Sequence, residues 1–98
     1  MKPIENLSVL VTGGGSGIGE GIAQFYIERG AKVTICGRRH EKIEAVAARL
    51  GEKCLAVKAD ITIQEDRRAA VESAVKHGGK LDVLVSNAGN MLRGDIDT

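Results

Sequence analysis

This 98-residue chain is poor in aromatic residues, cysteine and proline, and these shortages exclude several classes of protein. It has no tryptophan, and Phe25 and Tyr26 are its only aromatic residues, so it lacks the stacking platforms of single-stranded nucleic-acid binders. Its two cysteines, Cys36 and Cys54, each lie in or at the end of an apolar run. They are predicted to be small buried side chains in a reducing compartment rather than a disulfide or a metal pair.

An excess of one charge and long apolar runs are also missing. The formal net charge is +1 with both signs interspersed, which argues against nucleic-acid or membrane-surface binding. No apolar run approaches membrane-spanning length, and residues 1–3 leave no room for a signal peptide before the first apolar segment. We therefore expect a soluble, cytoplasmic protein.

Short apolar runs alternate with amphipathic segments along the chain. Runs at residues 7–11, 32–36, 54–59 and 81–86 are typical of strands in a parallel sheet. Helical patterns cover residues 18–29 and 40–50, and Thr62 with Glu65 forms a capping box for a third helix that runs to about residue 77. This βαβαβαβ pattern with short connections predicts an α/β fold, a Rossmann-type parallel sheet of strand order 3-2-1-4, which is a partial doubly wound fold.

The helical patterns also predict which faces pack on the sheet. The packing side chains expected in the first and third helices are Ile18, Ile22, Phe25, Tyr26, Ala70, Val71, Ala74 and Val75.

The predicted domain covers residues 1–90, and an irregular tail at 91–98 is expected to lead into a missing C-terminal catalytic part. In this strand order the run at 81–86 is an apolar edge, so we expect a complementary C-terminal segment or a second copy to cover it.

A glycine-rich stretch at residues 12–19 directly follows the first strand run and precedes the first helix. Such a turn binds anions, because glycine lets a ligand approach the backbone and a helix start offers unpaired N–H groups. A nucleoside-triphosphate loop needs lysine where Glu20 stands, a methyltransferase-type site needs a carboxylate at the end of the first strand run, and G-x-G-x-x-G fits no register. The spacing that does match is T-G-x-x-x-G-x-G, through Thr12, Gly13, Gly17 and Gly19.

This spacing resembles the cofactor loop of the short-chain dehydrogenase/reductase family, and two more family elements follow in order. Asp60-Ile61 comes after the third strand run, where the family has an acidic residue near the adenine ring. Asn87-Ala88-Gly89 comes after the fourth and matches the family's N-A-G element. The resemblance extends from residue 7 to about residue 89 and implies a bound nicotinamide dinucleotide.

The resemblance implies a role in cofactor binding for each element. Around the pyrophosphate and its ribose it implies Gly13, Gly15, Ser16 and Ile18, with Gly17 and Gly19 as glycines required by steric fit, the latter for close packing of helix and strand. Beside the adenine it implies Asp60 and Ile61, and along the middle of the cofactor Asn87, Ala88 and Gly89. A plain turn residue is the alternative interpretation of both Asp60 and Asn87.

The residues after the second strand run indicate which dinucleotide is bound. An NAD site needs a carboxylate there for the ribose 2′-OH, but residues 37–40 read Gly-Arg-Arg-His, with no acid before Glu41. Guanidinium groups suit a 2′-phosphate, so NADP(H) is expected over NAD(H), with Arg38 as the main contact and Arg39 as the second. A solvated charge is the alternative for Arg39, and Ser16 departs from the basic residue that many NADP-preferring relatives have there.

The chain lacks the family's catalytic signature, Tyr-x-x-x-Lys. Its single tyrosine, Tyr26, is followed four residues later by Gly30 and is predicted to belong to the core. The family transfers hydride between the nicotinamide and a carbonyl or alcohol carbon, so the resemblance places the catalytic serine, tyrosine and lysine outside this chain. We expect an NADP(H)-binding portion of an oxidoreductase that is inactive by itself, with a stand-alone, non-enzymatic dinucleotide-binding module as the alternative.

Overall fold

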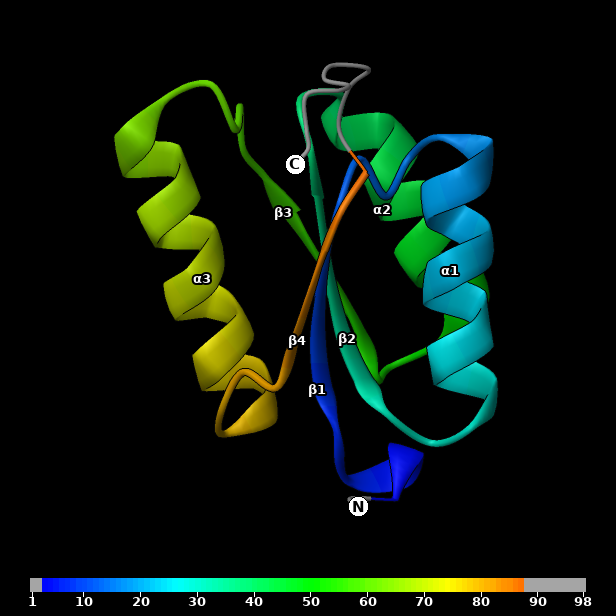
Figure 1. Ribbon diagram of the computed structural model, residues 1–98. Helices are drawn as coiled ribbons and strands as arrows, with labels where there is room; N and C mark the ends of the chain where they lie inside the picture. Colours follow the sequence, from blue (N-terminus) through cyan, green and yellow to red (C-terminus); the bar gives the residue numbers. More distant parts are fainter. Residues whose placement is uncertain (1–2, 88–98) are drawn as a thin grey trace.

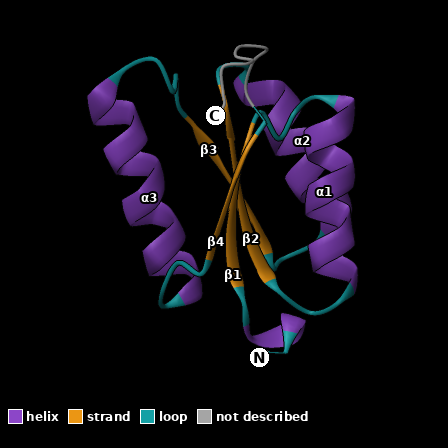
Figure 2. Cartoon of the chain, in the orientation of Figure 1, coloured by secondary structure: helices purple, strands orange, loops and turns teal. Residues whose placement is uncertain are grey.

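In the computed structural model, which describes residues 3–87, a four-stranded parallel sheet lies between helices on both faces (Figure 1) (Figure 2). The elements are η1, a 3-10 helix (Ile4–Asn6), β1 (Ser8–Thr12), α1 (Gly17–Glu28), β2 (Lys32–Gly37), α2 (His40–Leu50), β3 (Cys54–Lys58), α3 (Gln64–Gly78) and β4 (Val83–Ser86). The sheet order β3-β2-β1-β4, with every pair parallel, confirms the predicted fold and strand order. No helix within residues 3–87 is long and apolar enough to cross a membrane.

The central strand β1 is buried along its whole length because α1 and α2 cover one face of the sheet and α3 covers the other (Figure 1). Successive side chains of a strand point to opposite faces, so Val9 and Val11 belong to the core cluster of α1 and α2, and Leu10 to the cluster of α3. Cys36 and Cys54 are buried free thiols, as predicted, and burial raises the pKa of each to about 11.

Helix α1 buries a narrower face than its sequence pattern predicts. Ile22 packs against the core, but Ile18 is 71% exposed and Phe25 is 44% exposed, so the prediction is wrong for these two residues. The fully buried residues of the helix are the small ones, Gly19 and Ala23. Small residues let the helix axis approach the strands closely, whereas Ile18, in the first turn, does not reach the core.

Helix α3 begins later than predicted, and the capping box is wrong. The backbone N–H and the hydroxyl of Thr62 both donate to Oδ1 of Asp60, at 2.9 and 2.6 Å. Ile63 then occupies the N-cap position without a side-chain hydrogen bond, and the helix starts at Gln64. A local side-chain turn has therefore replaced the expected cap, since Asp and Thr side chains compete for nearby backbone groups.

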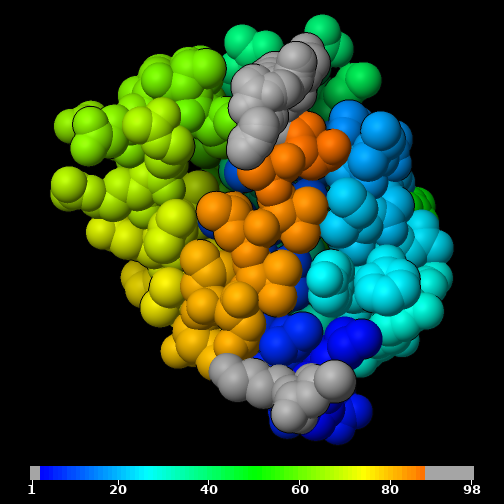
Figure 3. Space-filling model, viewed as in Figure 1, coloured from blue at the N-terminus to red at the C-terminus, as the bar shows by residue number. Residues whose placement is uncertain are grey.

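The last strand, β4, is an exposed edge of the sheet, as predicted. Its Leu84 is 57% exposed, and Figure 3 shows β4 in orange at the surface between α3 and α1. Val71 and Val75 of α3, predicted to pack, are 38% and 40% exposed, whereas Ala70 and Ala74 are buried. The face of α3 that packs on the sheet is therefore lined by alanine, and its larger apolar side chains remain accessible to solvent.

The unequal burial of two leucines yields a stability prediction. Leu10 is 2% exposed and Leu55, on the edge strand β3, is 36% exposed. Leu10→Ala should lower the free energy of unfolding by about 2–5 kcal/mol, because it removes buried contacts and leaves a cavity. Leu55→Ala is the matched control and should cost roughly 1 kcal/mol or less. Urea unfolding followed by circular dichroism measures both, and equal losses would contradict the burial described here.

Candidate functional site

The glycine loop between β1 and α1 is held against the neighbouring strand β2. The backbone N–H groups of Gly13 and Gly14 both donate to the carbonyl of Cys36, at 2.9 and 3.1 Å. Gly13 has a φ of +69°, in the left-handed region that favours glycine. A Cβ on Gly14 would lie 2.5 Å from Cβ of Ile35, so this glycine lets the loop lie directly on β2. Gly14 was not among the residues predicted for the site.

The hydroxyl of Ser16 joins the loop, the start of α1 and the end of β4. It donates to the carbonyl of Gly13 at 2.9 Å, and it accepts from the N–H of Gly19 at 3.2 Å and from Nδ2 of Asn87 at 3.1 Å. The backbone N–H of Asn87 also donates to Oγ1 of Thr12, at 2.8 Å. A serine hydroxyl has one hydrogen and two lone pairs, so these contacts use its full capacity. Asn87, directly after β4, therefore also fixes the loop.

Two glycines of the loop pattern differ in their surroundings. A Cβ on Gly19 would overlap the carbonyl of Gly13 and lie 2.9 Å from Nδ2 of Asn87. Close approach thus requires Gly19, and the backbone that it approaches is that of the loop, at Gly13, whereas the resemblance implied close packing of helix and strand. A Cβ on Gly17 would meet nothing within 4 Å, so packing within the described chain does not require this glycine. Within residues 3–87 the N–H groups of Gly17 and Ile18 have no acceptor, as is usual for the first residues of a helix.

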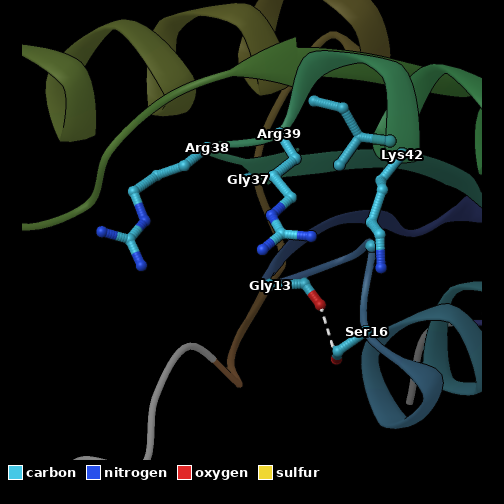
Figure 4. A pocket seen from close by; sticks show the side chains of 8 residues that line it. Gly13, Ser16, Gly37, Arg38, Arg39 and Lys42 are labelled. Carbon is cyan, nitrogen blue, oxygen red and sulfur yellow. Dashed lines mark hydrogen bonds between the residues drawn. The ribbon is translucent and has the colours of Figure 1, made fainter.

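A cavity of about 230 Å³ separates the glycine loop from the junction of β2 and α2 (Figure 4). The loop side consists of Gly13, Gly15 and Ser16, and the opposite side of Gly37, Arg38, Arg39, Lys42 and Ile43. The structure thus brings together five of the residues predicted for the site. Lys42 was missed, and its only signal in the sequence is its position one helical turn after the arginine pair. In Figure 4 the side chains of Arg39 and Lys42 extend toward the loop, and Arg38 extends to one side.

Asp60 and Ile61 lie at the end of β3 and do not line this cavity. Hydrogen bonds from the side chain and backbone of Thr62 hold the pKa of the Asp60 carboxyl below its usual range, and the positive charge of Arg38 lowers it further. Asp60 therefore organises the turn before α3 while facing the basic junction, and Ile61 packs against the apolar cluster under α3. The remaining predicted positions, Ala88 and Gly89, lie outside the described residues.

Glu20, at the position where a triphosphate loop has its lysine, turns toward α2 and away from the cavity. Its Oε2 atom lies 2.6 Å from Nη2 and 2.9 Å from Nε of Arg49. The pair links the two helices on one face of the sheet.

Within residues 3–87, no group of three histidine, cysteine, aspartate or glutamate side chains is placed to hold a metal ion.

Comparison with known proteins identifies relatives over nearly the whole chain. A family model described as short chain dehydrogenase matches residues 7–97. A 3-phenylpropionate-dihydrodiol/cinnamic acid-dihydrodiol dehydrogenase from Escherichia coli is 37% identical over 89 residues, which are 91% of this chain and 33% of that protein. The match confirms the family resemblance expected from the motifs.

Solved structures are similar over the same region. A 3-ketoacyl-(acyl-carrier-protein) reductase from Brucella melitensis, complexed with NADH, is 46% identical with a TM-score of 0.80 and covers 83% of this chain and 34% of its own. A short chain dehydrogenase from Bacillus anthracis is 30% identical with a TM-score of 0.84 and covers 91% of this chain and 37% of its own. This chain therefore spans about a third of the length of the relatives it matches.

The contrast between two glycines of α1 tests the packing of the loop. Gly19→Ala should lower the free energy of unfolding by about 1–3 kcal/mol, because the added methyl group overlaps the Gly13 carbonyl. Gly21→Ala, in the same helix but with nothing within 4 Å of the added group, should raise it by about 0.5–1 kcal/mol. Thermal or urea unfolding measures both variants. Changes of the same sign would show that the loop does not approach α1 as closely as described.

Proposed function

We propose that this chain, which belongs to the short-chain dehydrogenase family, is the NADP(H)-binding portion of an oxidoreductase. The observation that carries the proposal is the cavity between the glycine loop and the basic junction of β2 and α2. One wall offers backbone at the start of a helix, and the other offers three cationic side chains. Such a cavity suits a ligand that carries phosphate groups.

The residues present fit a dinucleotide, because each of its anionic parts has a suitable counterpart. The free N–H groups of Gly17 and Ile18 and the open space beside Gly17 suit a pyrophosphate that lies close to the backbone. Arg38 and Arg39 suit a dianionic 2′-phosphate, and no carboxylate lines the cavity to bind a ribose 2′-OH. We place Asp60 and Asn87 beside the adenine and the middle of the cofactor, with Ile61, Ala88 and Gly89 as their neighbours.

The chain's own residues would bind and orient the cofactor but would not carry out the proton transfer. When bound, the nicotinamide supplies or accepts a hydride. The proton that accompanies it needs a positioned acid or base, and Tyr26, the only tyrosine of the chain, packs against the core in α1. We therefore assign the catalytic serine, tyrosine and lysine to a segment outside these 98 residues.

Arg38→Asp tests the proposed choice of cofactor. Dissociation constants for NADPH and NADH are measured by fluorescence titration for the wild type and the variant. The wild type should prefer NADPH, and the variant should bind NADPH about 10- to 100-fold more weakly because a charge-assisted hydrogen bond is replaced by repulsion. Binding of NADH should be unchanged or tighter. Arg68→Asp, on α3, is the matched control and should leave both constants unchanged; unaltered discrimination in Arg38→Asp would refute the assignment.

The proposed division of labour predicts that the isolated chain is inactive. The purified chain should bind NADPH without reducing any of a panel of aldehydes and ketones, measured as loss of NADPH absorbance. A full-length short-chain dehydrogenase serves as the positive control. Turnover by the isolated chain would contradict the placement of the catalytic residues outside it, whereas absence of dinucleotide binding would contradict the proposed function itself.

A further inference from the structure

Lys42 lies in the wall of the cavity without any role assigned by the sequence motifs. It belongs to the first turn of α2, whose next residue, Ile43, is 1% exposed and anchors that turn in the core. A Cβ on Gly15 would lie 3.3 Å from Cβ of Lys42, so the stem of the lysine rests against the glycine loop. The side chain of Lys42 is therefore held beside the loop by the packing of its own helix turn.

Lys42 lines a second hollow together with Glu20, but the carboxylate of Glu20 is paired with Arg49. Within residues 3–87 neither Lys42 nor Arg39 forms an ion pair, whereas Arg49 of the same helix pairs with Glu20 at 2.6 Å. Cations in the first turn of a helix are also disfavoured by the helix dipole. Two unpaired cations that extend into one cavity at this end of α2 are an electrostatic cost that an anionic ligand would offset (Figure 4).

The loop itself offers no side chain that could take the place of Lys42. Ser16 is the only loop residue in the cavity wall with a polar side chain, and its hydroxyl hydrogen is donated to the Gly13 carbonyl. Arg38 extends to one side and acts on Asp60, whereas Arg39 and Lys42 extend toward the loop (Figure 4). A phosphate between the loop and α2 would thus have uncharged backbone on its loop side and the ammonium group of Lys42 on its α2 side.

We propose that Lys42 is a specificity-determining residue that binds the 2′-phosphate of NADP(H) from the side of α2, together with the arginine pair. This inference rests on the proposed function. An ammonium group is a compact point charge with three donors, so it suits a dianionic phosphate and gains little from a neutral 2′-OH. Lys42 should therefore contribute to binding of the phosphorylated cofactor and not of NAD(H).

Binding measurements on Lys42→Gln test this inference. The probes are NADPH, NADH, adenosine 2′,5′-bisphosphate and adenosine 5′-monophosphate, titrated by calorimetry at two salt concentrations. NADPH and the bisphosphate should bind roughly 5- to 20-fold more weakly to the variant, which is the usual range for one partly exposed charge-assisted contact. The dissociation constants of NADH and the monophosphate should not change. Binding of the bisphosphate to the variant should also depend less on salt, because one charge contact is gone.

Two further variants serve as controls. Lys42→Arg keeps the charge and should retain binding of NADPH within about threefold, which a purely structural role of the lysine would not require. Lys76→Gln removes an exposed lysine from α3 and should change nothing. Circular dichroism confirms that each variant is folded, as expected for the exposed side chain of Lys42.

The outcomes separate this inference from the function on which it rests. If the wild type binds NADH as tightly as NADPH, the proposed function fails in its choice of cofactor. If the wild type prefers NADPH and Lys42→Gln keeps the whole preference, the role of Lys42 is refuted while the proposed function stands. Equal weakening of NADPH and NADH would also overturn the inference, since Lys42 would then bind a part common to both dinucleotides.

Discussion

The site depends on one constraint, the parallel register of β1 and β2. Thr12 is paired with Cys36, so the glycine loop after β1 and the basic segment after β2 leave the sheet at the same edge. The carbonyl of Cys36 then accepts the N–H groups of Gly13 and Gly14, which continues the pairing of the strands into the loop. Arg38 comes two residues after this carbonyl, so the pairing of the strands brings the arginine segment beside the loop, and the packing of α2 then adds Lys42.

The end of β4 lies at the same edge of the sheet and also holds the glycine loop in place. Thr12 is also paired with Ser86, so Asn87 emerges beside the loop and reaches both Ser16 and Thr12. The loop before α1 is therefore held by β2 on one side of β1 and by Asn87, directly after β4, on the other. Because β1 is the one strand within residues 3–87 that pairs with β4, any cover over β4 would stabilise the hydrogen bonds of Asn87 as well. The exposed edge strand and the glycine loop are therefore linked through the hydrogen bonds of Asn87 and Thr12.

The strands, their order and the loop were predictable because they follow from periodicity, short connections and glycine spacing, all of which are local in sequence. The rest depends on contacts between distant residues. The capping box at Thr62 failed because Asp60, two residues earlier, takes its hydroxyl. The need for glycine at position 14 comes from Ile35 on another strand. The position of Lys42 in the cavity wall follows from the way α2 packs opposite the loop, which the sequence pattern does not indicate.

The proposed choice of NADP(H) over NAD(H) rests on charge at this edge, because the loop alone does not distinguish the two dinucleotides. The backbone of the glycine loop is neutral and suits the pyrophosphate that NAD(H) and NADP(H) share. The charged side chains that line the opposite wall of the cavity are all cationic, and the carboxylate of Asp60, which accepts two hydrogen bonds from Thr62, does not line it. A hydroxyl group does little to balance unpaired cations, whereas a phosphate dianion balances them well. The proposed preference for NADP(H) therefore rests on the start of α2 rather than on the loop from which the family is identified.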